Sequence, residues 1–138
     1  MIPIFTASWA ATVPPDHVRI GISRGLPRRQ SGFKTYRWLA PGPWFRSVPA
    51  DEYLRRFEEE ILAPLDPEAV VSDLEHMTGG RPAVLLCFER ASDIDAGRLW
   101  CHRHLVAEWL ENTLSIDVPE YGWPRFDRWG ALRRLGAR

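Results

Sequence analysis

The sequence predicts an α/β fold, a small three-layer sandwich with a mostly parallel central sheet of about four strands flanked by helices. Residues 83–88 (AVLLCF) are continuously apolar, which is typical of a strand buried on both faces of a parallel sheet. A helical pattern at residues 99–110 and a further short strand at residues 115–118 follow this run, in the order of a right-handed strand–helix–strand crossover unit. The length of 138 residues, 45% of them hydrophobic, suits one domain over residues 1–138 with one core.

In the first half of the chain, residues 2–9 and 18–23 have the pattern of short strands, and residues 14–16 (PPD) form the turn between them. Residues 24–49 are rich in arginine, glycine, proline and aromatic residues without a clean period, so we expect a long basic aromatic loop. Residues 50–62 are predicted to be helical because their apolar positions form one stripe: Tyr53, Leu54, Phe57, Ile61 and Leu62.

A second helix is predicted from Pro67 to about Met77, with Asp66 as its cap and a stop at Gly79 and Gly80. Beyond the buried strand, residues 99–110 are predicted to form a helix, and residues 115–118 a final strand. Residues 121–138 form an Arg/Trp-rich C-terminal arm. The inward positions of the helix would be Leu99, Val106, Trp109 and Leu110.

Composition limits the function classes. The sequence has no apolar run of about 18 residues, and its first 12 residues lack the charged start and apolar core of a signal peptide. We therefore expect a cytoplasmic protein that does not enter a membrane. In the cytoplasm, Cys87 and Cys101 should stay reduced, which argues against a structural disulfide.

The formal net charge is zero, but the charges are segregated. Residues 17–50 contain seven cations and no acid, whereas residues 51–95 contain twelve acids and four cations. A block without counter-charges faces solvent or meets an anion. Arginine suits phosphate binding, although a GC-rich genome would give the same arginine bias. Trp9, Trp38 and Trp44 lie in or beside this block, where they would fasten the loop, roof a pocket or stack on bases.

The strand order predicts where a site would lie. Ligands of open α/β sheets bind beyond the carboxyl ends of the strands. This rule brings several residues from distant parts of the sequence to one edge: Ser8, Trp9, Ser23, Arg24, Cys87, Glu89, Cys101, His102 and Arg103.

Four segments make the sequence recognisable: VRIGISRGLPRR, YRWLAPGPWF, AVLLCFER and WCHRHLVAEWL. Together they resemble the bacterial family called domain of unknown function 488, up to about Glu120. The resemblance rests on Ser23-Arg24 with Pro27, on the strand ending Leu86-Cys87-Phe88-Glu89, and on Cys101-His102-Arg103 opening a helix. Many relatives have Asp-Val-Arg where this chain has Ile22-Ser23-Arg24. The resemblance implies the fold and the site but no established activity.

The residue types at this edge suit nucleophilic chemistry. A thiol in the first turn of a helix, near Arg98, Arg103 and a protonated His102 or His104, has a lowered pKa, which would make Cys101 a thiolate. Glu89 would act as a general base or orient His102, and Arg24 and Arg103 would clamp an anion. The alternative is structural: Cys101 half-buried, and Glu89 merely paired with Arg103.

Cys87 lies in an apolar strand, where a free cysteine usually packs as a small hydrophobe. A zinc site formed by Cys87, Cys101 and a histidine or Glu89 is a weaker reading, because adjacent Cys101 and His102 would rarely bind one ion. We therefore expect neither a metal nor a cofactor.

Two functions remain in competition. The first is an enzyme with an anion-binding cleft, in which Cys101, His102 and Glu89 act on a nucleotide-like, phosphorylated or modified-base substrate, held by Arg24, Arg103, Ser23, Ser8 and Trp9. The second is a nucleic-acid-binding or adaptor module that works through the basic aromatic loop. The sequence also leaves open a scaffold for a protein partner, and it does not predict the oligomeric state.

Overall fold

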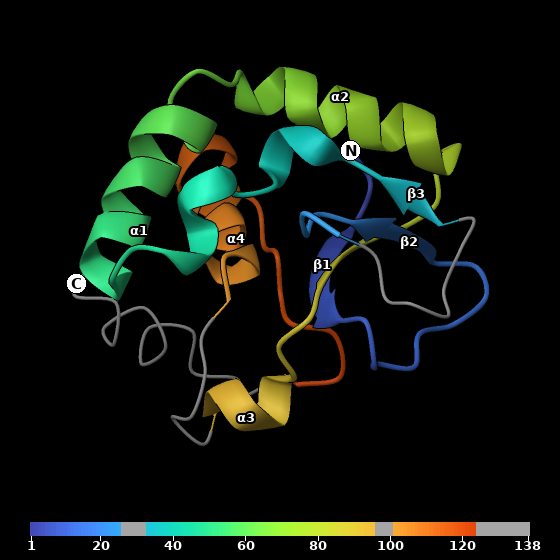
Figure 1. The fold of residues 1–138 in the computed structure, drawn as a ribbon. Helices are drawn as coiled ribbons and strands as arrows, with labels where there is room; N and C mark the ends of the chain where they lie inside the picture. Colours follow the sequence, from blue (N-terminus) through green and yellow to red (C-terminus); the bar gives the residue numbers. More distant parts are fainter. Residues whose placement is uncertain (26–32, 96–100, 124–138) are drawn as a thin grey trace.

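The apolar strand at residues 83–87 lies inside a parallel sheet. The computed structural model describes residues 1–25, 33–95 and 101–123. Its four strands are all parallel, and their order is β1 (Ile4–Ser8), β4 (Ala83–Cys87), β2 (Val18–Gly21) and β3 (Lys34–Thr35) (Figure 1). Strand β4 is buried at every position between β1 and β2. The expected α/β fold with a parallel sheet is therefore confirmed.

The main core lies between one face of the sheet and the helices. It joins strand residues such as Ile4, Ile20 and Leu85 to α1 (Ala50–Arg56), η3 (Phe57–Leu62), α2 (Pro67–Thr78) and α4 (Arg103–Leu114). The predicted helix 50–62 is continuous, but it widens to π-type hydrogen bonds in η3, where the Ala63 N–H bonds to the Glu58 carbonyl. Helix α2 begins as predicted, with the Asp66 side chain accepting from the Glu68 N–H at 3.0 Å.

The opposite face of the sheet is covered differently. Its buried residues Ala7, Val84 and Leu86 pack with Trp9. Partly buried side chains from connecting segments complete this layer: Phe5, Ala11, Val13, Phe33 and Tyr121. Within the described ranges, loops rather than helices therefore form this second layer. The predicted arm lies almost wholly outside the described residues, which end at residue 123.

The predicted long loop contains more structure than expected. After residues 26–32, which are not described, the chain forms β3 and then two short 3-10 helices, η1 (Arg37–Leu39) and η2 (Pro43–Arg46). Tyr36, Leu39 and Trp44 are buried in the main core and anchor this segment. These elements have two to four residues each, too few to produce a periodic pattern in the sequence.

The predicted final strand at residues 115–118 does not form. The backbone N–H of Val118 donates to the Glu111 carboxylate at 2.9 Å, so it is not available to a sheet. An isolated bridge follows instead, in which Thr6 of β1 pairs through its N–H with the Pro119 carbonyl and through its carbonyl with the Tyr121 N–H. Helix α4 therefore leads back to the edge of β1 without adding a strand.

Candidate functional site

Two cysteines and a histidine meet where β4 ends and α4 begins. Cys87 is the last residue of β4, and Cys101 and His102 come directly before Arg103, the first residue of α4. One ligating atom from each of the three side chains lies within 4.8 Å of the others, and all three residues are buried. The carboxyl edge therefore brings together Cys101, His102 and Cys87.

Cys101 does not lie in the first helical turn as the sequence predicted. His102 is the N-cap of α4, and Cys101 precedes it. The first helical N–H groups bond to the carbonyl oxygens of Cys101 and His102, at 3.2 Å from His104 and 3.1 Å from Val106. They do not point at the sulfur, so the helix stabilises a thiolate less than expected. The predicted start of this helix at Leu99, and the nearby Arg98, lie outside the described residues.

Cys87 and Cys101 are joined by a disulfide. The prediction of two reduced thiols is therefore contradicted, and Cys87 is more than a small apolar residue of a strand. The reason is tertiary: the segment before α4 crosses the end of β4, where both cysteines pack with Ile94 of α3 (Ala91–Asp95). Their Cα atoms are 7.3 Å apart, wider than the roughly 4.4–6.8 Å usual for a disulfide.

His102 is a buried neutral imidazole with a defined orientation. Its Nε2 lies 2.8 Å from the Ile22 carbonyl oxygen, and its Nδ1 lies 3.8 Å from the sulfur of Cys101. Burial lowers the pKa of His102 to about 4, so the expected positive charge is absent at neutral pH. A carbonyl only accepts hydrogen bonds, so Nε2 carries the proton and the lone pair of Nδ1 faces Cys101.

Arg103 is fully buried, and its guanidinium bonds to the protein itself. It donates to both carboxylate oxygens of Glu120, at 3.1 and 2.7 Å. It also donates to the Cys87 sulfur at 3.2 Å and to the Glu89 carbonyl at 2.7 Å. These contacts favour a role for Arg103 in positioning Cys87, and they leave it turned away from solvent.

Glu120, which sequence reasoning missed, is the centre of this ion-pair cluster. Burial by itself would raise its pKa, but hydrogen bonds from His104 and Arg103 and their positive charge lower it to about 2. The hydroxyl of Thr6 adds a fourth hydrogen bond at 2.6 Å. No motif marked this residue, because its partners come from β1 and α4, more than ten positions away.

Glu89 faces Cys87. Its carboxylate oxygen lies 3.7 Å from the Cys87 sulfur, and the side chain is partly exposed. Burial and the charge of Glu89 raise the pKa of Tyr53 on α1. Glu89 thus lies on the Cys87 side of the sulfur pair, whereas His102 lies on the Cys101 side.

The remaining predicted residues line the same edge in a separate chain of contacts. The Trp9 indole donates to the Ser23 hydroxyl at 3.2 Å, and the Ser8 hydroxyl accepts from the Ala10 N–H at 2.9 Å. Arg24 is exposed and donates to the Pro41 carbonyl at 3.0 Å, with its guanidinium 5.8 Å from the Phe45 ring. Arg24 therefore lies on the loop segment, while Arg103 is buried under Glu120.

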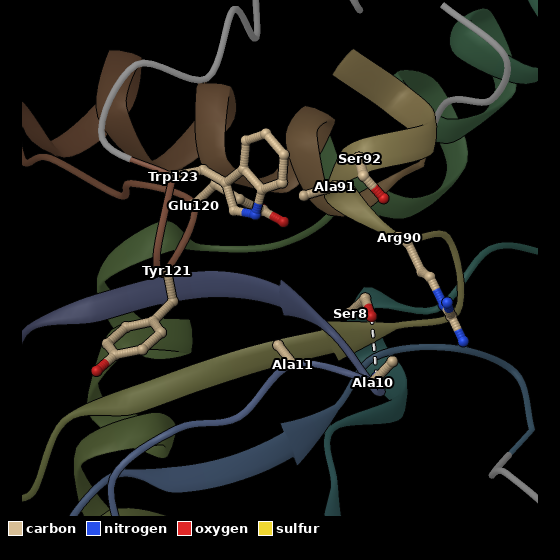
Figure 2. Close-up of a pocket in the computed structure, with 9 residues that line it drawn as sticks. All are labelled: Ser8, Ala10, Ala11, Arg90, Ala91, Ser92, Glu120, Tyr121 and Trp123. Atoms are coloured by element: carbon tan, nitrogen blue, oxygen red, sulfur yellow. Dashed lines mark hydrogen bonds between the residues drawn. The ribbon is translucent and has the colours of Figure 1, made fainter. Parts of the chain in front are cut away.

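A pocket of about 300 Å³ opens at the same edge of the sheet, and neither cysteine nor His102 is among the residues that line it. Figure 2 shows Ser8 in its floor and Arg90 at one side, with Trp123 and Tyr121 on the other. Glu120 also lines the pocket, so the buried ion-pair cluster reaches its wall. Since Ser8 is paired with Cys87 across β1 and β4, the pocket and the cysteines share the same edge of the sheet.

Comparison with known proteins identifies the family. No helix within the described ranges has the length and apolar character needed to cross a membrane. No curated protein matches the chain, and no solved structure does. The family model DUF488-N3a, described as the active DUF488-N3 subclade, matches residues 4–114, which include every strand and helix described above. The parallel sheet and the Cys-His-Arg segment at its edge thus fall inside this match, and the chain belongs to the DUF488 family.

Proposed function

We propose that the protein is an enzyme in which the reduced Cys101 attacks a small anionic, nucleotide-like, phosphorylated or modified-base substrate, with His102 as the proton acceptor. One observation carries the proposal: the lone pair of His102 Nδ1 lies 3.8 Å from the Cys101 sulfur, at the carboxyl edge of the sheet. A nucleophile beside an oriented base is the arrangement that covalent catalysis needs.

The orientation of His102 supports this role. Its Nε2 proton is held by the Ile22 carbonyl, so the ring presents only Nδ1 to the sulfur. With the disulfide closed the ring is neutral, because burial lowers its pKa to about 4. Burial thus opposes protonation, and only the negative charge of a thiolate formed beside Nδ1 would favour it. Ile22 directly follows β2, so a backbone carbonyl at the end of this strand, and not a side chain, orients the imidazole of His102.

The proposed reaction conserves atoms, electrons and protons. The Cys101 thiol transfers its proton to Nδ1 of His102, and the sulfur forms a bond to the electrophilic atom of the substrate. The bond from that atom to its leaving group breaks, and the leaving group takes the proton from His102. Water then releases the covalent intermediate by the reverse proton path.

The reactive form is the dithiol. The disulfide accepts two electrons from a thiol or phosphine reductant, which is itself oxidised, and two protons from that thiol or, with a phosphine, from water; this releases both sulfurs. Cys101 then lies next to His102, whereas Cys87 lies between Arg103 and Glu89. The two thiols therefore have different surroundings, and Cys101 is the one beside a base.

The pocket supports the substrate class. Arg90 at its rim suits a phosphate or carboxylate, and Tyr121 and Trp123 offer aromatic surfaces for a base or a similar ring. Its volume of about 300 Å³ falls at the small end of the range for ligand sites. In this proposal Arg90 binds the anion, in place of the buried Arg103.

The first test is the pH dependence of Cys101 alkylation in the reduced, metal-free variant Cys87→Ala. If Cys101 passes its proton to Nδ1, the resulting thiolate–imidazolium pair should bring the midpoint below the ordinary thiol value of about 8.5. His102→Asn cannot form this pair and should raise the midpoint. His76→Asn is the matched control, because His76 is exposed on α2. An ordinary or raised midpoint, or labelling only after unfolding, would exclude Cys101 as the nucleophile. Once a substrate is found, Cys101→Ser should abolish turnover without changing the fold.

Nucleic-acid binding is the second candidate, and one observation favours it. Trp38 is 69% exposed beside Arg37, within the acid-free block of the sequence. An exposed aromatic ring next to arginines suits base stacking with phosphate contacts. A labelled single-stranded oligonucleotide should then bind more weakly as salt rises, and Trp38→Ala should weaken it further. Absence of binding at low salt would reject this candidate.

A further inference from the structure

We propose that the reduced protein binds one zinc-type divalent ion through Cys87, Cys101, His102 and Glu89. The inference goes beyond the proposed reaction and does not depend on it. It rests on the juxtaposition of two sulfurs and an imidazole nitrogen at the end of β4. The Glu89 carboxylate lies outside this group of three, 3.7 Å from the Cys87 sulfur, and is the nearest candidate for a fourth ligand. Thiolate and imidazole ligands in one small cluster favour zinc over magnesium or calcium.

The distances fit a tetrahedral ion. Two ligands on one zinc ion, at bond lengths of about 2.3 Å for sulfur and about 2.0 Å for nitrogen or oxygen, lie roughly 3.6 Å apart. The Cys101 sulfur lies 3.8 Å from His102 Nδ1, and the Cys87 sulfur lies 3.7 Å from the Glu89 carboxylate oxygen. Each sulfur thus has one further donor atom near the spacing of a shared ion, and the Glu89 side chain must swing toward His102 to complete the set.

The backbone positions of Cys87 and Cys101 allow the two sulfurs to separate after reduction. On reduction they must move to roughly 3.8 Å apart to share the ion. The Cα separation of 7.3 Å is already wider than a disulfide usually spans, so this change needs side-chain rotation more than backbone movement. Cys101 and His102 are adjacent in the sequence, and adjacent residues rarely bind one ion, but their position at the start of α4 makes it possible here. Cys101 precedes the helix, and both ligating atoms point to the same side.

The surrounding contacts are those of a metal centre. A ligating histidine typically donates its other ring N–H to a backbone carbonyl, as His102 does to Ile22 at 2.8 Å. Arg103 donates to the Cys87 sulfur at 3.2 Å, which would offset charge on a bound thiolate. Three of the four ligands are buried, and Glu89 is partly exposed, so the ion would enter from the Glu89 side.

The test is a cobalt titration of the full chain, reduced with a phosphine under anaerobic conditions and freed of reductant and chelator. Cobalt is a spectroscopic substitute for zinc in sulfur-containing sites. We expect visible tetrahedral bands and a sulfur-to-cobalt charge-transfer band that saturate at one ion per chain, and zinc should displace the cobalt. The protein kept as the disulfide should give neither signal.

Variants assign the ligands. Cys87→Ala and Cys101→Ala should each remove about half of the charge-transfer intensity, because each removes one of two thiolates. His102→Asn should weaken binding by at least tenfold, and Glu89→Gln should weaken it by about tenfold while keeping the sulfur band. His76→Asn, the control, should bind as the wild type does. Circular dichroism of each variant separates loss of a ligand from loss of the fold.

A second measurement needs no variant. Zinc should protect both thiols of the reduced wild-type protein from alkylation, as counted by mass spectrometry. The proposal fails if the reduced protein gives no charge-transfer band, or if zinc leaves both thiols fully reactive. It also fails if the cysteine variants bind cobalt as the wild type does. Because Cys101 reactivity is tested in metal-free protein, the metal site and the nucleophile can fail separately.

Discussion

Two buried polar clusters lie next to each other at the start of α4, and they are stabilised in different ways. In the ion-pair cluster, Arg103 and His104 bond to the Glu120 carboxylate, which also accepts from the Thr6 hydroxyl. In the sulfur cluster, Cys87, Cys101 and His102 are neutral, and the Nδ1 lone pair of His102 faces only a sulfur. The first cluster is held by ion pairs within the protein, whereas the second is the place where we propose that a proton, a substrate or a metal binds.

The difference between the two clusters shows which buried polar groups stabilise the fold. A buried charge is costly unless it is paired, so Arg103 and Glu120 each depend on the other. Thiols and a neutral imidazole carry a much smaller desolvation cost, so they can be buried without saturated hydrogen bonds. Adjacent positions in the sequence, His102 and Arg103, therefore serve different purposes.

The largest effect should come from breaking the ion pair. Arg103→Met leaves Glu120 buried with one cationic partner fewer, and we expect unfolding free energy to fall by about 3–5 kcal/mol. Urea denaturation followed by tryptophan fluorescence measures this. The control is Arg55→Met, because Arg55 forms an exposed pair with Glu59 at 3.2 Å, and this change should cost about 0.5 kcal/mol or less. Equal losses in the two variants would contradict the comparison.

Lowering the pH should destabilise the protein mainly through the same ion-pair cluster. The pKa of Glu120 falls from 4.5 to about 2 on folding. Its stabilisation is therefore complete above pH 4.5 and is lost as the pH falls toward 2. The shift corresponds to roughly 3 kcal/mol. Unfolding free energies measured across this range should show a steeper loss for the wild type than for Glu120→Gln. Parallel profiles would show that Glu120 is not the titrating group.

Reducing the disulfide should lower the free energy of unfolding by no more than the protonation of Glu120 does. It joins two cysteines that are 14 positions apart in the sequence, so reduction should lower the unfolding free energy by at most about 3 kcal/mol. In reduced protein, Cys101→Ser should then change stability by only about 1 kcal/mol. Denaturation with and without reductant measures both effects. If the reduced protein does not fold, the disulfide is needed for the stability of the fold, and the comparison of the two clusters is wrong.

The smallest effect is expected at the surface. Trp38 is 69% exposed, so Trp38→Ala should change the unfolding free energy by about 0.5 kcal/mol or less. The same denaturation assay measures it. This variant is therefore safe for the oligonucleotide test, because any loss of binding would not come from unfolding. A loss of several kcal/mol would contradict the assignment of Trp38 to the surface.

Local patterns predicted the elements well where these are long and periodic. The buried strand at Ala83–Cys87, the helix after Asp66 and the parallel order of the sheet follow from apolar runs and caps. Short elements were missed, because β3 and the two 3-10 helices are too short for a period. The final strand was predicted wrongly, because a side chain of α4, Glu111, takes the N–H that the strand would have used.

For the site, the sequence alone determined the residue types and the edge of the sheet where they meet, because parallel strands all end at one edge. Only the tertiary structure decided their partners. It joined Cys87 to Cys101, left His102 neutral against the Ile22 carbonyl, and buried Arg103 on Glu120 instead of turning it toward a ligand. Protonation and pairing depend on burial and on neighbours from distant segments, and no local pattern carries that information.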